Sequence, residues 1–204
     1  MEKQNFQLLM ERQFESLKGG ERLLLHSCCG PCSSYVLDVL TKHFDVTLLY
    51  YNPNIYPAEE YQKRLGEQLR LIKEMPFEKS VSYMACEYDE GEFLQEAKGF
   101  EREREGGARC EKCFRLRLKK TALEAQKNGF DFFTTTLSVS PHKNAQVLNE
   151  IGKELEKEYG VKYLYADFKK KDGYKKSVKL SEQYNLYRQD YCGCRFALSH
   201  QKGG

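Results

Sequence analysis

Seven of the eight cysteines in this 204-residue chain fall into three short clusters. In chain order the clusters are Cys28-Cys29-Gly30-Pro31-Cys32, Cys110-Glu111-Lys112-Cys113 and Cys192-Gly193-Cys194. Thiolates are soft metal ligands and also the reactive form of cysteine in redox chemistry. Clusters this far apart in the sequence predict one metal or redox centre that is assembled from across the fold. The remaining cysteine, Cys86, stands alone and is expected to pack in the interior.

The first cluster, taken alone, favours a thiol-disulfide oxidoreductase. A strand followed by Cys29-Gly30-Pro31-Cys32 and then a helix is a layout that activates a thiol at a helix N-terminus. Such a domain needs only about half of this length, and the other clustered cysteines would have no role. An oxidoreductase acting through Cys29 and Cys32 therefore remains an alternative, ranked below a metal centre.

Two kinds of metal centre fit the cysteine clusters. Four thiolates close a structural zinc site, so a zinc-stabilised RNA-binding module is a second alternative. Iron-sulfur clusters also take four cysteine thiolates, and we favour iron-sulfur over zinc. Seven thiols exceed what one such site uses, which predicts a larger cluster, a second metal or a redox couple. Cys192 and Cys194 fit either one metal or a small strained disulfide of the labile kind.

Composition indicates where this centre operates. A hydrophobic content of 40% suffices for one core, so we expect a single domain. The first 20 residues carry both acids and bases, unlike a signal or transit peptide. No apolar run approaches the length of a membrane span, so no membrane partner is expected. These features predict a cytoplasmic protein, where clustered cysteines indicate metal binding or catalysis rather than structural disulfides.

Basic residues gather in two segments, although the net charge is only +3. Residues 161–180 contain seven lysines with aromatic residues among them, and a second basic group surrounds Cys110 and Cys113. Such runs are typical either of solvated helix faces or of a surface that binds nucleic acid.

The elements that must position the cysteines alternate between strand and helix. Strands are expected over 22–27, 45–51, 78–83, 130–137 and 161–166. Helices are expected over 4–18, 31–42, 57–74, 89–98, 111–128, 142–159 and 174–188. This order predicts a single-domain, doubly wound α/β fold with a mainly parallel five-stranded sheet, Rossmann-like and similar to PP-loop and HUP folds. Residues 1–20 would form an N-terminal helical extension, and residues 21–204 the catalytic domain.

Five ordered strings resemble the cobalamin-independent epoxyqueuosine reductases, the QueH family. The strings are HSCCGPCSS (26–34), YYNPNIYPAEEYQKR (50–64), RCEKCFRLRL (109–118), TTTLSVSPHKN (134–144) and SEQYNLYRQDYCGCRFA (181–197). The resemblance implies reduction of epoxyqueuosine to queuosine in tRNA, the last step of queuosine biosynthesis. It further implies a 4Fe-4S cluster beside a second iron. The implied partners are tRNA carrying epoxyqueuosine in its anticodon and an unidentified electron donor.

The resemblance also implies a role for each clustered cysteine. The 4Fe-4S ligands by position are Cys28, Cys29, Cys110 and Cys113. The catalytic group by position is Cys32, Cys192 and Cys194, as ligands of the second iron or as a redox-active group.

Other side chains are expected at the same sheet edge, because ligands of open α/β sheets bind outside the carboxyl ends of the strands. Candidates for proton supply are His26, Asp167 and Tyr191, each of which also has a structural interpretation. Candidate contacts to the modified base are Tyr51, Asn52, Asn54, Ser138, Ser140 and Lys143. The lysines at 169–171 are expected to meet tRNA phosphates.

Overall fold

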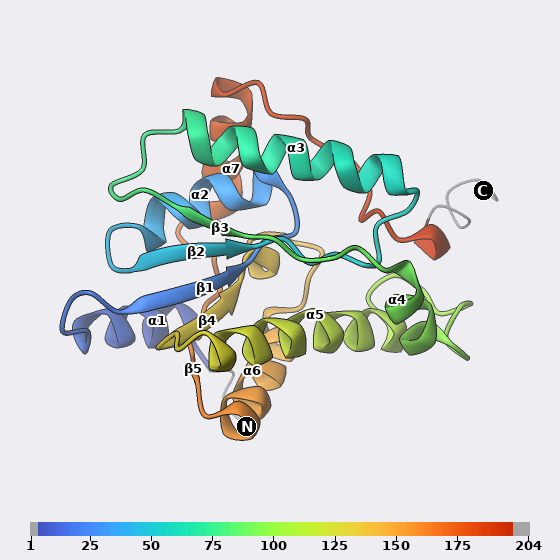
Figure 1. The fold of residues 1–204 in the computed structure, drawn as a ribbon, viewed down its shortest axis with the longest axis horizontal. Coiled ribbons are helices and arrows are strands. Elements are labelled where there is room, and N and C mark those ends of the chain that lie inside the picture. Colours follow the sequence, from blue (N-terminus) through green and yellow to red (C-terminus); the bar gives the residue numbers. More distant parts are fainter. Residues whose placement is uncertain (1–3, 198–204) are drawn as a thin grey trace.

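The computed structural model describes residues 4–197 and contains a parallel five-stranded sheet (Figure 1). Its strands are β1 (Arg22–His26), β2 (Asp45–Leu49), β3 (Ser82–Met84), β4 (Phe132–Thr135) and β5 (Lys162–Tyr163). They pair in the order β3-β2-β1-β4-β5, and every pair is parallel. The central strand β1 is apolar over Leu23, Leu24 and Leu25, all of them fully buried, because helices cover both faces of the sheet.

Helices lie on both sides of this sheet. They are α1 (Phe6–Glu15), α2 (Gly30–Leu40), α3 (Ala58–Glu74), α4 (Glu90–Ala97), α5 (Ala108–Lys127), α6 (Ala145–Tyr159) and α7 (Gly173–Gln183). In Figure 1, α2, α3 and α7 lie on one side of the sheet, and α5 and α6 lie on the other. The chain first moves outward from β1 to β3 and then returns to β4 and β5, so its crossovers cover opposite faces. The predicted doubly wound fold is confirmed.

Successive residues of β1 feed two separate cores. Leu23 and Leu25 belong to the cluster that contains Leu37 of α2, whereas Leu24 belongs to the cluster that contains Leu118 of α5. Side chains alternate between the two faces of a strand, and this alternation divides the apolar run between the two helical layers.

Helix α1, within the expected N-terminal extension, packs onto the domain. Met10 is buried in the same cluster as α2. The Gln13 side chain donates to the Tyr163 carbonyl and accepts from the Tyr165 amide, each at 2.9 Å. These two bonds satisfy backbone groups in β5 and just after it. Because β5 is an outer strand of the sheet, these groups would otherwise be free to pair with a further strand.

Several strands are shorter than predicted because side chains replace strand partners. Strand β4 gives way to a 3-10 helix, Thr136–Val139, capped by the Thr135 hydroxyl, which accepts from the Leu137 amide. After β5, the Asn149 side chain binds both backbone groups of Ala166 at 2.9–3.0 Å. Backbone groups satisfied in this way need no sheet neighbour.

The glycines of two helices allow a matched test of packing. A Cβ on Gly152 of α6 would lie 2.3 Å from the Tyr163 ring, whereas one on Gly66 of α3 would meet nothing within 4 Å. We expect Gly152→Ala to destabilise the fold by about 1–3 kcal/mol through overpacking. Gly66→Ala should stabilise it by about 0.5–1 kcal/mol through helix propensity. Denaturant unfolding of both variants measures these changes, and equal effects would contradict the tight contact at Gly152.

Candidate thiolate centre

The first cysteine cluster lies at the point where the chain reverses its direction across the sheet. Strands β1 and β4 are neighbours whose following segments leave toward opposite faces, and ligand crevices form at such a point. The Cys28 amide donates to the Thr136 hydroxyl at 3.2 Å, and this hydroxyl lies 3.3 Å from the Cys28 Sγ. The ends of the two strands are thus joined through the cysteine itself.

Three sulfurs gather in this crevice. The Sγ atoms of Cys28, Cys29 and Cys32 all lie within 4.8 Å of one another, with 3.8 Å between Cys28 and Cys29. Cys29 is the N-cap of α2 and Pro31 lies in its first turn, so the first turn of the helix brings Cys32 back toward the pair. Ligands of one tetrahedral metal with metal-sulfur bonds of about 2.3 Å stand about 3.8 Å apart. The spacing therefore fits thiolates that share a metal.

Hydrogen bonding within this group divides its protons unequally. Thiol donors from Cys29 and Cys32 hold the pKa of Cys28 well below its usual range. Donation to Cys28 in turn raises the pKa of Cys29 to about 12, and it raises that of Cys32 as well. Without metal the group favours one thiolate, and a bound cation would be needed to deprotonate the other two.

The other four clustered cysteines lie on α5 and in the C-terminal segment. Cys113 and Cys194 belong to one small buried cluster, against which Cys192 packs. Cys110 lies one turn before Cys113 and accepts a hydrogen bond from the Gly106 amide at 3.2 Å. Burial raises the pKa of Cys113 to about 12. The Cys113 thiol is thus protonated while no metal is bound.

The structure therefore brings all three cysteine clusters to one region, in two groups. The first group is Cys28, Cys29 and Cys32, and the second is Cys113, Cys192 and Cys194 together with Cys110, one turn before Cys113 on α5. Cys110 itself is buried in the core cluster against which Cys28 packs. The predicted division placed Cys32 with the C-terminal pair and the α5 cysteines with Cys28 and Cys29. That assignment of ligands to individual metals stays a prediction. Cys86 is half-buried and belongs to neither group.

Contacts from the β2–α3 region hold the Cys192-Gly193-Cys194 turn in place. Gly193 has φ +93°, and its carbonyl accepts from the Tyr56 amide at 2.9 Å. Arg64, only 2% exposed, donates to the Cys192 carbonyl at 3.2 Å and pairs with Glu60 at 2.7 Å. The position of the last two thiols is therefore set by the second crossover of the sheet.

A cavity of about 490 Å³ opens over the thiols. Its lining includes Cys28, Cys29, Cys32 and Cys192. Polar and aromatic side chains of the lining include Asn54, Ser140, His142, Lys143, Tyr174 and Tyr191. This volume lies in the range of small-molecule sites, which span roughly 300–1,000 Å³. The site therefore has room for one modified nucleobase.

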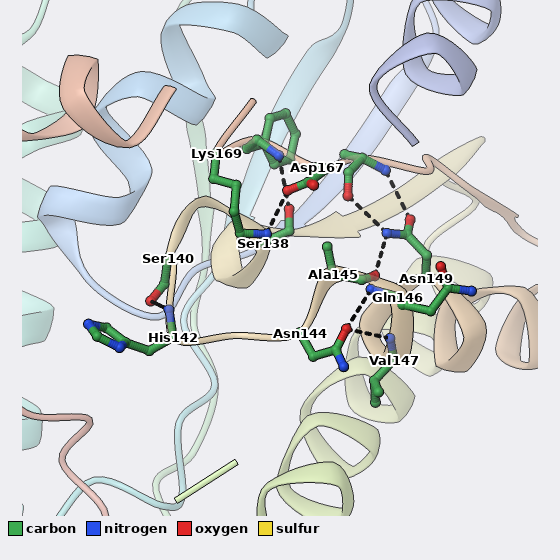
Figure 2. A network of polar contacts seen from close by, with 12 residues as sticks. Ser138, Ser140, His142, Asn144, Ala145, Gln146, Val147, Asn149, Asp167 and Lys169 are labelled. Atoms are coloured by element: carbon green, nitrogen blue, oxygen red, sulfur yellow. Dashed lines mark hydrogen bonds and ion pairs between the residues drawn. The ribbon is translucent and has the colours of Figure 1, made fainter. Parts of the chain in front are cut away.

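Residues of the loop after β4 line one side of this cavity. Figure 2 shows the polar contacts of this loop. The Ser140 hydroxyl accepts from the His142 amide at 3.3 Å, and the Asn144 side chain caps α6. Asn149 ties the start of α6 to the segment after β5. The loop is thus fixed by side-chain hydrogen bonds at both ends.

The predicted substrate contacts divide between different environments. Asn52, Asn54, Ser140 and Lys143 line the cavity. Asn54 is 2% exposed and its Oδ1 has no hydrogen-bond partner within residues 4–197, which leaves an acceptor for a ligand. Ser138 instead accepts from the Phe168 amide at 3.3 Å (Figure 2).

Tyr51 faces a different cavity from the thiols. Its hydroxyl donates to Glu92, and both residues line a second cavity of about 390 Å³ that also includes Cys86. A role for Tyr51 at the thiolate site is therefore not supported by its position.

Of the three candidates for proton supply, Tyr191 alone lines the cavity over the thiols. His26 is fully buried, with Nε2 3.0 Å from the Tyr51 carbonyl and Nδ1 2.8 Å from the Thr135 hydroxyl. A carbonyl only accepts, so Nε2 carries the proton and Nδ1 accepts. Burial, together with the charge of Arg117, lowers the pKa of His26 to about 3, which makes it a neutral structural residue.

Asp167 is also structural in its contacts. It binds Lys169 at 2.6 Å and lies outside the lining of the cavity (Figure 2). By contrast, sequence reasoning gave no individual role to Arg64 or Arg117, which both line the cavity. The spacing of Arg117, one helical turn after Cys113, was the available signal.

Within residues 4–197, no helix combines the length and the apolar character required to cross a lipid bilayer. The fold and the site define an α/β protein with a thiol-lined ligand cavity at the switch point of its sheet. The family model described as epoxyqueuosine reductase QueH matches residues 23–200. The chain belongs to this family of oxidoreductases.

Individual relatives agree with the family match. Epoxyqueuosine reductase QueH of Streptococcus pyogenes is 42% identical over 181 residues, which cover 88% of this chain and 71% of the relative. That of Staphylococcus epidermidis is 43% identical over 190 residues, covering 90% and 80%. That of Thermotoga maritima is 38% identical over 184 residues, covering 88% and 92%.

Two left-handed glycines test how tightly the Cys192–Cys194 turn is held. Alanine at either Gly193 or Gly129 costs about 1–2 kcal/mol in backbone strain. A Cβ at Gly193 would also lie 3.1 Å from both Arg64 Nη1 and Ile55 Cγ1, whereas one at Gly129 would meet nothing within 4 Å. We expect Gly193→Ala, unlike Gly129→Ala, to speed alkylation of Cys192 and Cys194, measured by mass spectrometry. Equal alkylation rates would contradict this anchoring.

Proposed function

We propose that this chain reduces epoxyqueuosine to queuosine in tRNA, the last step of queuosine biosynthesis. The carrying observation is a cavity of nucleobase size lined by thiols from two distant segments, in a member of the epoxyqueuosine reductase family. Loss of the epoxide oxygen to leave an alkene takes two electrons and two protons and releases water. We also propose a cytoplasmic location, because the proposed substrate is a tRNA.

We infer that the thiols hold iron. The proposed 4Fe-4S ligands are Cys28, Cys29, Cys110 and Cys113, and Cys32, Cys192 and Cys194 would hold a second iron or form a redox-active group. The donor set supports this inference, because soft thiolates select iron-sulfur clusters and zinc over harder ions. When bound, such a centre supplies single electrons, and an iron with an open position polarises oxygen.

The residues of the cavity would bind and orient the modified base. The free Oδ1 of Asn54 accepts a hydrogen bond from a hydroxyl or amine of the ligand. Lys143 remains cationic there: burial opposes its charge, but negative charge on Cys192 and Glu105 outweighs burial and raises the pKa of Lys143. Lys143 and the Tyr191 hydroxyl would present donors toward an oxygen that leaves with negative charge.

A pair of cysteine substitutions tests the metal and the reaction together. Anaerobically purified protein should be brown, with about four or more irons per chain, and should convert epoxyqueuosine-containing tRNA under reducing conditions. Cys110→Ser should lose iron, colour and conversion. Cys86→Ser should keep all three, because Cys86 lines the second cavity and not the one over the thiols. Iron analysis, visible spectra and nucleoside analysis by mass spectrometry measure these outcomes.

Other results would support the alternative functions. Colourless protein with stoichiometric zinc would favour a zinc-stabilised RNA-binding module. A metal-free, reversible dithiol would favour an oxidoreductase acting through Cys29 and Cys32. Iron-loaded protein that left the epoxide intact with several electron donors would overturn the assignment.

Lysines after β5 supply the proposed tRNA phosphate contacts. Lys169 and Lys171 pair with Asp167 and Glu11, and Lys170 has no ion-pair partner in the described part of the chain. Reversing the charge of all three should weaken tRNA binding and flatten its salt dependence, because fewer phosphates are neutralised. Fluorescence anisotropy at several salt concentrations measures both.

A matched control for this variant reverses the charge of three lysines near the amino ends of the strands, whereas residues 169–171 follow the carboxyl end of β5. Lys73 and Lys127 lie in the last turns of α3 and α5, and Lys79 pairs with Asp45 at the start of β2. The control variant should bind tRNA as the wild type does, and both variants should keep the visible spectrum. Unchanged affinity of the 169–171 variant at moderate salt would remove this patch from the proposal.

A further inference from the structure

Four basic side chains with little solvent exposure surround the thiols. Arg64 pairs with Glu60, and Lys143 pairs with Glu105. Arg109 and Arg117, 2% and 4% exposed, have no carboxylate partner among residues 4–197. A charge removed from water without an opposite charge is strongly unfavourable, so both guanidinium groups need compensation.

Arg109 and Arg117, the two arginines without a carboxylate partner among residues 4–197, differ in their hydrogen bonds and in their position relative to the cavity. Arg109 donates to the carbonyls of Phe100 and Glu101 at 3.2 and 2.7 Å, and it lies over the Phe196 ring at 5.3 Å. Two backbone carbonyls and an aromatic ring therefore compensate the charge of Arg109. Arg109 does not line the cavity.

Arg117 also lies over an aromatic ring, that of Phe114 at 5.7 Å, but unlike Arg109 it lines the cavity. Its Nε donates to the Cys113 carbonyl at 3.2 Å, and its Nη1 lies 3.5 Å from the Asn52 Oδ1. A guanidinium has five N–H donors, so most of them are uncommitted, and both acceptors are neutral. Burial opposes the charge of Arg117, but sulfurs of both thiol groups, on Cys113, Cys192, Cys28 and Cys110, raise its pKa. The charge of Lys143 also reaches Arg117 and opposes it.

We propose that Arg117 is the countercharge of the thiolate centre, a positioning residue that lies between the two thiol groups and balances the negative charge they acquire when they bind metal. Ligating thiols lose their protons, so four thiolates around one divalent ion carry a net negative charge. In an interior that excludes water, that charge requires a nearby cation. The inference rests on the proposed metal binding, and it does not depend on which substrate is reduced.

This role predicts effects that differ between the metal-free and the metal-loaded protein. Without metal, the thiols carry less negative charge than they do as metal ligands, and Arg117 is a buried cation with no carboxylate partner among residues 4–197. Its replacement by an apolar residue should then leave stability unchanged or increase it. With metal, the same replacement leaves thiolate charge unbalanced, which should weaken metal binding. It should also make the reduction potential of bound iron more negative, because reduction adds further negative charge.

The test compares Arg117→Met, Arg117→Gln and Arg117→Lys with Arg115→Met. Arg115 lies on the same helix, is half-exposed and pairs with Glu154, so it controls for the loss of an arginine from α5. Anaerobic titration of the metal-free protein with Co²⁺ reports affinity through the thiolate-to-metal absorption band. We expect Met and Gln to weaken Co²⁺ binding about 10–100-fold, the range typical of groups that support metal ligands. Lys should fall between these and the wild type, and Arg115→Met should have no effect.

Thermal unfolding and potentiometry complete the test. Arg117→Met should lower the melting temperature of the Co²⁺-loaded protein relative to the wild type, but not that of the metal-free protein. In iron-reconstituted protein its midpoint potential should be more negative. Equal destabilisation with and without metal, together with unchanged Co²⁺ affinity, would show a merely structural residue and overturn the inference.

The glutamine variant keeps the test valid if the methionine variant does not fold. Glutamine can still donate a hydrogen bond near Cys113 but carries no charge, so wild-type Co²⁺ affinity in Arg117→Gln would also overturn the inference. Failure of the proposed function gives a different result: the epoxide stays intact in wild-type protein while the Arg117 variants still lose Co²⁺ affinity.

Discussion

The reversal of chain direction between β1 and β4 is the constraint on which the site depends. Because all strands are parallel, every segment that follows a strand starts at the same edge of the sheet. Cys28 follows β1, Thr136 follows β4, and the hydrogen bonds between them close the gap where the helical layers separate. Helix α5 runs back from this same edge, so its first turns carry Cys110 and Cys113. Thiols from distant segments therefore lie close together, because the segment after β1 and the first turns of α5 are at the same edge of the sheet.

The sequence was sufficient for the order of elements and for the place of the first cluster, but not for the orientation of single side chains. Apolar runs such as Leu23 to Leu25 mark buried parallel strands, and Pro31 marks the start of a helix. Tyr51 and Asn52 show the limit. Neighbouring residues beyond the end of a strand face different cavities, so an error of one position reverses their roles. His26 likewise required its two partners before its tautomer and its structural role could be assigned.

Burial affects the thiols and the nearby cations in opposite ways in the metal-free and the metal-bound protein. Burial of Cys113 raises the pKa of its thiol, so that thiol keeps its proton until a metal displaces it. The cations placed around the thiols have the reverse preference, because they are best compensated when the thiols are ionised. Metal binding therefore satisfies both sets of groups at once, and the fold without metal leaves charge unbalanced at Arg117.

The last thiols of the chain depend on contacts made much earlier in it. Arg64 and Tyr56, from the β2–α3 region, hold the carbonyls of Cys192 and Gly193. These donors fix the segment after α7 beside the cavity, and Gly193, with φ +93°, adopts a left-handed turn in which a Cβ would lie 3.1 Å from Arg64 Nη1. A metal that bridges this turn to α2 or α5 would couple the end of the chain to the centre of the sheet. The complete thiolate centre therefore requires tertiary packing between segments that are distant in the sequence.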